Sequence, residues 1–410
     1  MLFLSGDVIY RSGYRIRVLS ELKALARQPD QDKPPFQLYA LFFLSPKHLR
    51  YLFSEDSSLT GLRQGGVSVY QVPGLPNMPW PGLYLNLLWM TLVGGLVVRW
   101  KEIGLIHAQN LYFAFVALIL KKLWGVRYIL DMHGLVPEES LYQNPLRRHA
   151  SFRVLKWMEE KCVVNADCVL CVSQALSQYL QSQYNASASR IIVIPSGVDP
   201  SLFHYDVQTR RELRVHRGLN SRLIVLYAGN IGRWHAEARL VELFREIKAR
   251  REDAYFLVLT PAPTKQLAHL LSSSSDMEIE EDYTVLSVAH HEVPFYSMMA
   301  DVALLVRERN RVNEVACPTK FVEYLACGVP VLASSGVGDV DRIVRQHKIG
   351  ATFDTDDSAS RREAIENILA LIEKDDRSKE RCAWVARQYF SWEANIRPVA
   401  TMYRRLGEGG

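Results

Sequence analysis

Short apolar segments alternate with amphipathic ones along this chain of 410 residues, and the pattern occurs twice. Such alternation is typical of parallel β-sheets whose strands are joined by crossover helices. In the first half, strands are expected near Leu2–Leu4, Gln37–Leu44, Ser68–Val72, Leu105–Ala108, Arg127–Leu130, Val169–Val172 and Ile191–Ile194. In the second half, they are expected near Leu223–Ala228, Tyr255–Leu259, Thr284–Val288, Val302–Val306 and Val329–Ala333.

The region between the two patterns, Pro200–Asn220, is polar and basic, so the domain boundary is expected there. A chain of this length also suits two domains better than one. We therefore predict an α/β protein with a first Rossmann-like domain over residues 1–205 and a second one over residues 206–388. In open α/β sheets, ligands bind outside the carboxyl ends of the strands, where a cleft is expected.

Composition and charge narrow the functional classes. The chain is 48% hydrophobic and 23% charged, which is typical of a globular protein. Its net charge of +5 comes without a Lys/Arg-rich run, so nucleic acid is not an expected partner. The first residues, Met1–Asp7, lack a basic region before an apolar core and are interpreted as the start of a strand instead of a signal peptide.

Six cysteines raise the question of a metal site. Cys168 and Cys171 lie in an expected strand, where residues three apart point to opposite faces, and no second ligand pair follows. We therefore expect buried, reduced thiols, which suit a cytoplasmic protein.

The stretch Gly82–Val98 carries no charge and is flanked by Trp80 and by Arg99–Lys101. It lies at the lower length limit for a membrane span and contains Asn86 and Thr91. We predict a buried or membrane-leaning helix here, not a true span. Together with the mild positive charge, it favours peripheral association with the inner face of a membrane.

The segment Cys317–Pro330 (CPTKFVEYLACGVP) carries the clearest functional signal. Pro318 suits the first turn of a helix, and Gly328 followed by Pro330 suits its end. The helix predicted over Pro318–Cys327 offers free N–H groups near Thr319, which can bind a diphosphate or sugar hydroxyls.

Lys320 and Glu323 are three residues apart and share one face of this helix. A carboxylate one turn into such a helix can hold the vicinal diol of a ribose. Alternatively, the two residues form an ordinary solvated surface pair.

The segment resembles the Ser-Pro-x-Lys-x-x-Glu-Tyr-Leu-Ala-x-Gly-x-Pro variant of the family 4 retaining glycosyltransferases. The resemblance implies a GT-B architecture of two facing Rossmann-like domains, with Glu323 on the ribose of the donor and Pro318 and Thr319 beneath it. Many members carry a second Glu eight residues earlier, near the donor sugar; here Val315 stands at that position, with Glu314 beside it. Cys317 replaces the usual Ser.

Segments of the first domain also resemble this family. Gly13, in Ser-Gly-Tyr-Arg, corresponds to its first glycine loop, and Asp131-Met-His133-Gly134 to its Asp-x-His-Gly segment. The resemblance implies that His133 lies by the donor sugar and that Gly13, Asp131 and Gly134 line the acceptor side. Alternatively, Gly13 only turns the chain and His133 is structural.

In the second domain, Gly229-Asn230 through Arg233 resembles the glycine loop after the first strand. Arg233 is the expected diphosphate ligand, because guanidinium binds phosphate bidentately. The usual Lys-Gly is absent, since His235-Ala-Glu stands there. A second cation must then come from Lys320 or Arg307.

Two further expectations come from the second half. The backbone of Val293 contacts the nucleotide base, as the resemblance implies, and Arg307 follows a strand end, although it could equally be a surface residue. The final segment, residues 389–410, resembles the terminal helix that returns to the first domain.

The resemblance implies a metal-independent transferase without a cofactor, in which His133, Arg233 and Lys320 act on a nucleotide-sugar donor. We do not interpret any Asp-x-Asp triplet of the sequence as the metal motif that metal-dependent transferases use, so a metal ion is not expected. The acceptor is expected to be a glycan or a lipid-linked glycan, in the synthesis of cell-surface polysaccharide or glycoconjugate. Two alternatives remain: a nucleotide-sugar epimerase of the same fold, and a non-catalytic protein that binds sugar nucleotides.

Overall fold

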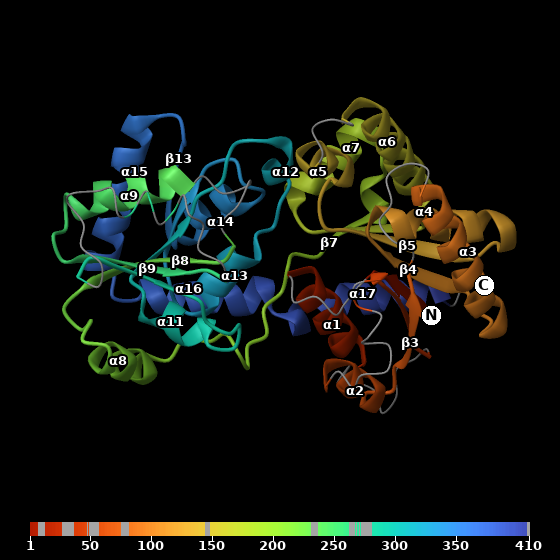
Figure 1. Cartoon of the computed structure of the whole chain (residues 1–410), viewed down its shortest axis with the longest axis horizontal. Helices are drawn as coiled ribbons and strands as arrows, with labels where there is room; N and C mark the ends of the chain where they lie inside the picture. The colour runs from red at the N-terminus through yellow and green to blue at the C-terminus, as the bar shows by residue number, and fades with distance from the viewer. Residues whose placement is uncertain are drawn as a thin grey trace. The chain divides into compact units, whose positions relative to one another are not determined.

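The computed structural model describes residues 1–6, 13–26, 37–46, 48, 57–74, 82–143, 148–230, 237–261, 267, 269, 271 and 281–407. The chain folds into two compact units (Figure 1). The first unit contains Met1–Pro195 together with Trp392–Gly410, and the second contains Ser196–Ser391. Each unit has its own parallel sheet.

The first unit is built on a seven-stranded parallel sheet of order β3-β2-β1-β4-β5-β6-β7. Its strands are β1 Leu2–Ser5, β2 Tyr39–Leu44, β3 Ser68–Pro73, β4 Leu105–Gln109, β5 Arg127–Met132, β6 Cys168–Cys171 and β7 Ile191–Val193. Its helices are α1 Gly13–Ala26, α2 Ser57–Gln64, α3 Gly82–Trp100, α4 Asn110–Trp124, α5 Val136–Gln143, α6 Arg148–Asn165, α7 Gln174–Tyr184, the 3-10 turn Ala188–Arg190 and α17 Trp392–Gly407.

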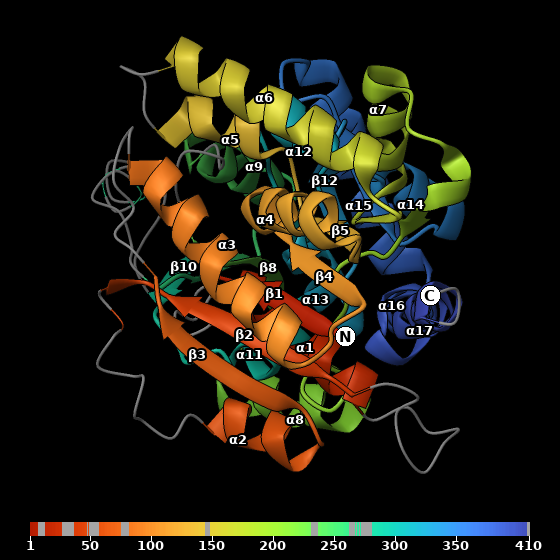
Figure 2. The same ribbon diagram turned by 90° about the vertical axis from the view of Figure 1, so that its right-hand side faces the viewer.

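Helices cover both faces of this sheet. On one face, apolar residues of α1, α2 and α17 share a buried cluster with the strands, for example Leu22, Leu62 and Val399. On the other side of the sheet lie α3 and α4, as Figure 2 shows. Because both faces are covered, the strands are apolar almost throughout, as in other buried parallel sheets.

The second unit is built on a six-stranded parallel sheet of order β10-β9-β8-β11-β12-β13. Its strands are β8 Leu223–Ala228, β9 Ala254–Leu259, β10 Tyr283–Leu286, β11 Val302–Leu305, β12 Val331–Ser334 and β13 Gly350–Phe353. Its helices are α8 Val207–His216, α9 Glu237–Lys248, α11 Val293–Met299, α12 Arg311–Glu314, α13 Thr319–Ala326, α14 Val340–His347, α15 Ser358–Lys374 and α16 Ser378–Phe390. Residues of α13, α14 and α16 pack on one face, and residues of α9 and α15 pack on the other.

The units divide earlier than the predicted boundary after residue 205. Val198 and Phe203 belong to the hydrophobic cluster of the second unit, and the N–H of Val198 donates to the carbonyl of Phe390. Residues 196–205 therefore pack with the second unit, and the chain returns to the first unit at Trp392 instead of residue 389. There, Tyr403 of α17 packs into the first unit's cluster.

The prediction of two Rossmann-like α/β sheets is confirmed, and each predicted strand is present with small shifts at its ends. One strand, β13, was not predicted. It has only four residues, and Gly350 is required because a Cβ there would lie 2.0 Å from the carbonyl oxygen of Val331. All six cysteines are free, and Cys317 is the one that is partly exposed.

Candidate functional site

In each sheet, successive strands are first added on one side of the first strand and later ones on its other side. The order changes between β1 and β4 in the first unit and between β8 and β11 in the second. Ligands of open α/β sheets bind at the carboxyl ends of strands at such switch points. Of the predicted site residues, Gly229 and Asn230 follow β8, and Arg307 follows β11 closely. In the first unit, Asp131 lies near the end of β5 and His133 follows that strand.

Gly229 makes room for a lysine from another element. Its φ of +131° disfavours any residue with a side chain, and a Cβ there would lie 2.0 Å from Cε of Lys320. The glycine loop and the start of α13 are therefore in direct contact. This explains in physical terms why a glycine is needed at this position.

Lys320 lies across this loop. Its Nζ donates to the hydroxyl of Tyr227 (2.7 Å) and to the carbonyl of Asn230 (3.4 Å), and the same Tyr227 hydroxyl donates to that carbonyl (2.7 Å). Burial, reinforced by the neighbouring charge of Arg307, lowers the pKa of Lys320 to about 7, while Glu323 acts in the opposite direction. Lys320 is thus poised between its charged and neutral forms near neutral pH.

Hydrogen bonds fix both the backbone and the side chain of Arg307. Its N–H donates to the hydroxyl of Ser334 (2.9 Å), and its Nη1 donates to the Oδ1 of Asn313 (3.1 Å). Burial lowers the pKa of Arg307, and its Nε has no hydrogen-bond partner among the described residues. Arg307 lies close enough to Lys320 to affect its charge, and a buried donor without a partner beside a second cation suits an anion.

The helix predicted from Pro318 runs over Thr319–Ala326 as α13, with Pro318 at the N-cap position and Thr319 as its first residue. Tyr324 fixes the helix to the end of β8, because its hydroxyl accepts from the N–H of Ala228 (2.8 Å) and donates to the same residue's carbonyl (3.2 Å). The N–H groups at the start of α13 are thereby held close to Lys320. Free N–H groups at a helix start favour phosphate.

Glu323 lies one turn into α13 and is partly exposed, with its Oε1 3.7 Å from the Nε2 of His290. His290 belongs to the turn before α11, whose first residue is Val293. The structure thus brings Glu323 close to the turn before Val293, at which the base contact was predicted. A carboxylate with an accessible edge can accept from two sugar hydroxyls.

The position of the second glutamate carries no carboxylate. Val315 is buried, and the adjacent Glu314 pairs with Arg311 at 3.0 Å on the surface of α12. Glu314 therefore does not replace the missing group in this structure. The predicted diphosphate ligand Arg233 and the neighbouring His235 lie outside the described residues.

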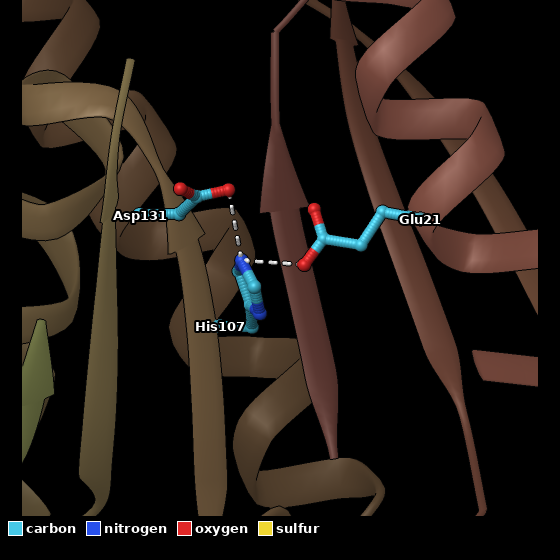
Figure 3. Close-up of side chains that lie close together, drawn as sticks. All are labelled: Glu21, His107 and Asp131. Carbon is cyan, nitrogen blue, oxygen red and sulfur yellow. Dashed lines mark ion pairs between the residues drawn. The ribbon is translucent and has the colours of Figure 1, made fainter. Parts of the chain in front are cut away.

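In the first unit, a fully buried polar cluster lies at the switch point (Figure 3). The Nε2 of His107 lies 3.7 Å from Oε1 of Glu21 and 3.6 Å from Oδ2 of Asp131. The amide of Gln109 donates to Oε2 of Glu21 (3.1 Å) and to Oδ2 of Asp131 (2.9 Å). On its other side, Nδ1 of His107 hydrogen-bonds the hydroxyl of Tyr403.

The two carboxyls of this cluster titrate in opposite directions. Burial raises the pKa of Glu21 to about 7, although His107 opposes the shift. Burial would also raise the pKa of Asp131, but Arg17, which donates to its Oδ1 at 3.2 Å, holds it well below its usual range. Asp131 is therefore the charged member of the pair, and Glu21 is largely protonated at mildly acid pH.

Glu21, His107 and Asp131 also have the spacing of a metal-binding group, the one group of this kind in the described part of the chain. Their environment does not fit a cation. Arg17 already neutralises Asp131, and the Gln109 amide nitrogen lies within hydrogen-bond distance of all three members of the group. We interpret the cluster as a hydrogen-bond network.

His133 is tied to this network. Its Nε2 lies 3.0 Å from Oδ2 of Asp131 and 3.1 Å from Nε of Arg17. Both contacts use one nitrogen, so either Arg17 donates to the neutral ring or the ring donates to Asp131. Burial, together with Arg17, lowers the pKa of His133 against the opposing effect of Asp131, which favours the neutral ring at pH 7.

The remaining predicted residues of the first unit, Gly13, Gly134 and Asp131, have roles in the local structure. Gly13 is the first residue of α1. A Cβ at Gly134 would lie 2.6 Å from Oε1 of Glu139, so this glycine lets the first turn of α5 approach the end of β5. Asp131 is fully buried, and its contacts with Arg17 and His133 make it a residue that positions others.

Several residues of these sites were not predicted, namely Arg17, Glu21, His107, Gln109 and Tyr403 in the first unit and Tyr227, Asn313 and Tyr324 in the second. A signal for Glu21 exists in the sequence, because it falls on the apolar stripe of α1 between Val18 and Leu22. A charged residue on such a stripe must find a buried partner.

Comparison with known proteins follows the same division of the chain. Residues 14–202 match the model of Glycosyltransferase Family 4, and residues 209–383 match that of Glycosyl transferases group 1. A D-inositol 3-phosphate glycosyltransferase of Paenarthrobacter aurescens is 26% identical over 321 residues, which are 74% of this chain and 73% of that protein.

Solved structures show the same fold. Sucrose-phosphate synthase of Thermosynechococcus elongatus has a TM-score of 0.75 at 18% identity, with 100% of both chains covered. The Anabaena protein HepE, in complex with UDP and glucose, has a TM-score of 0.69 at 18% identity, over 99% of this chain and 100% of that one. At this identity the likeness establishes the GT-B architecture.

Proposed function

The chain belongs to the family 4 glycosyltransferases, and we propose that it transfers a sugar from a nucleotide diphosphate sugar to a hydroxyl of a glycan or lipid-linked acceptor. We further propose that the transfer retains the anomeric configuration and needs no metal ion. Retention rests on the resemblance to a retaining family.

The donor assignment rests on one observation: two cationic side chains, Lys320 and Arg307, lie near each other and are both partly buried. Each positive charge disfavours the other, and the pKa of Lys320 falls to about 7 as a result of burial and of Arg307. Such an arrangement is costly without an anion and favourable with one. The free N–H groups at the start of α13 add to the same preference.

In the proposed reaction, the nucleoside diphosphate leaves the anomeric carbon and gains negative charge. Lys320, Arg307 and the start of α13 stabilise that charge, and Arg233 is proposed as a further ligand of the diphosphate. This is electrostatic catalysis by groups already in place before the reaction. It requires Lys320 to be protonated, so donor binding is coupled to proton uptake.

The other roles follow from position. We propose that Glu323 holds the ribose hydroxyls and that the backbone near Val293 contacts the base. His133, held by Arg17 and Asp131, is proposed to hydrogen-bond the reacting sugar as a neutral ring.

We propose a cytoplasmic protein at the inner face of a membrane, in the synthesis of cell-surface polysaccharide or glycoconjugate. Free thiols support the compartment, because disulfides persist in oxidising surroundings. The exposed apolar residues of α3 support proximity to lipid.

The test is transfer and hydrolysis with UDP-glucose, GDP-mannose and ADP-glucose, with and without EDTA, followed by NMR of the anomeric proton of the product. We expect turnover with one nucleotide class, unchanged by EDTA, and an α-linked product. Glu323→Gln should raise the KM for the donor at least about tenfold, the value of a lost charged hydrogen bond. The matched control, Glu366→Gln on the exposed side of α15, should leave it unchanged.

One observation favours a second function. Val315 replaces the carboxylate expected near the donor sugar, so the chain could bind sugar nucleotides without transferring the sugar. Binding of a donor without turnover, in the presence of any tested acceptor or of water, would support this alternative and overturn the transferase proposal. Epimerised sugar nucleotide in the same assay would identify an epimerase.

A further inference from the structure

The outward side of α3 is a stripe of large apolar residues, with Leu96 71% and Trp100 68% exposed. The other members, Leu85, Leu88 and Leu92, are more than half exposed and follow at helical spacing. Soluble proteins rarely leave such a continuous stripe in water, and stripes of this kind mark interaction surfaces.

The opposite side of α3 is packed within the first unit. A Cβ at Gly95 would lie 2.7 Å from the ring of Trp124, and one at Gly94 would contact Leu120, so the helix lies tightly on α4. The indole N–H of Trp89 donates to the carbonyl of Pro73 at the end of β3 (2.7 Å). The position of α3 is therefore fixed by its own unit.

Length and composition alone would allow α3 to cross a membrane, and it is the one such helix in the described part of the chain. Its connections argue against a span. The strands before and after it, β3 and β4, belong to the same sheet, so both ends of the helix must stay on one side of a bilayer. The helix can meet a membrane only by lying along its surface.

Charge and aromatic residues gather at the C-terminal end of the helix. Arg99 is exposed there, and the Nζ of Lys101 lies 3.7 Å from the ring centroid of Trp100. Trp124 of α4, next to Gly95, is also exposed. Tryptophan and basic side chains beside an apolar surface favour the headgroup region of anionic membranes.

We propose that this surface, the α3 face, docks on an anionic lipid bilayer. It consists of Leu85, Leu88, Leu92, Leu96 and Trp100, bordered by Arg99, Lys101 and Trp124. The leucines enter the apolar boundary of the bilayer, and the basic residues contact lipid phosphates. The inference rests on the proposed location at a membrane, and it does not involve the donor site, which lies in the second unit.

The experiment is flotation of the full chain with vesicles of phosphatidylcholine alone and of phosphatidylcholine mixed with phosphatidylglycerol. The test variant is Leu88→Gln/Leu92→Gln/Leu96→Gln, in which all three side chains are exposed and the fold should be kept. The control is Val207→Gln/Val215→Gln, two exposed apolar residues of α8 in the second unit. Unchanged thermal unfolding midpoints verify that both variants fold.

We expect the wild type to float with the anionic vesicles, less so at 1 M salt, where screening is strong. The leucine variant should show a partition coefficient at least about tenfold lower, because three apolar side chains no longer leave water. The control variant should float like the wild type. A second charge variant, Arg99→Gln/Lys101→Gln, should reduce the preference for anionic over neutral lipid.

Equal flotation of the leucine variant and the wild type would overturn the proposal, as would a wild type that binds neither vesicle. A second copy of the chain is the other possible occupant. A dimer in sedimentation that the leucine variant converts to a monomer, without any flotation of the wild type, would assign the face to self-association and refute lipid docking. Because no sugar transfer is measured, failure here leaves the proposed enzymatic function unaffected.

Discussion

Donor binding should take up a proton at Lys320. In the free protein the pKa of Lys320 is lowered to about 7, so at pH 8 about nine-tenths of the molecules carry a neutral amine. A bound diphosphate favours the charged form, so binding at pH 8 should take up about 0.9 proton, and at pH 6 about 0.1. The affinity for the donor is therefore highest below pH 7. Above pH 7 it falls by up to about tenfold per pH unit, until the pH reaches the pKa of Lys320 in the complex.

Calorimetric titration measures this uptake directly. The ligand is whichever of UDP-glucose, GDP-mannose and ADP-glucose binds with measurable affinity. Its heat of binding is measured at pH 8 in two buffers that differ in ionisation enthalpy. The difference in heat gives the number of protons taken up. The diphosphate of a sugar nucleotide has no titrating group near neutral pH, so it does not contribute.

Lys320→Arg isolates the responsible residue. Arginine keeps its charge throughout this range, so the variant should bind the donor with almost no proton uptake and little pH dependence. Lys374→Arg, on the exposed end of α15, should behave like the wild type. Equal uptake by the wild type and Lys320→Arg would refute the reasoning, because another group would then take up the proton.

Three further predictions concern the packing around the two sites. Burial raises the pKa of Glu21 from 4.5 to about 7, so it disfavours folding as pH rises from about 4.5 to about 7, by about 3 kcal/mol in total. In Glu21→Gln, the free energy of unfolding relative to the wild type should thus improve by about 2.5 kcal/mol between pH 5 and pH 8 in urea titrations, because part of the effect is already present at pH 5. A constant difference would contradict the shift. Gly229→Ala meets both a positive φ and Lys320, so it should cost about 1–3 kcal/mol of stability and weaken donor binding; unchanged calorimetric affinity would show that the contact is unimportant. Tyr324→Phe leaves the N–H of Ala228 unpaired and should cost about 1–3 kcal/mol in the same urea assay; a cost near zero would mean that the N–H finds another partner.

The strands were predictable because a buried parallel sheet needs apolar residues on both faces. Leu223–Ala228 is such a run, and it forms β8 over the predicted residues. The start of α13 was predictable for a related local reason, since Pro318 and Gly328 mark its two ends. By contrast, Gly350–Phe353 begins with glycine and alternates partly buried and buried residues, so it lacks the continuous apolar run that marks the other strands of this sheet.

The polar network of the first unit was not predictable in this way. Glu21, His107 and Tyr403 come from elements far apart in the sequence, and only the fold brings them together. The predicted pair in the second unit shows the same limit. Lys320 and Glu323 share a helix, but Lys320 donates hydrogen bonds to Tyr227 and Asn230, which precede it by 93 and 90 residues.

The central claim is that the surroundings of α13 form the donor site of a nucleotide-sugar transferase. A structure of the full chain with a bound nucleotide sugar tests it most directly. We predict diphosphate oxygens within about 3 Å of the Nζ of Lys320 and of the first N–H groups of α13, and ribose hydroxyls at the same distance from the carboxylate of Glu323. A nucleotide bound elsewhere in the chain, with Lys320 and Glu323 free of contact to it, would contradict the account.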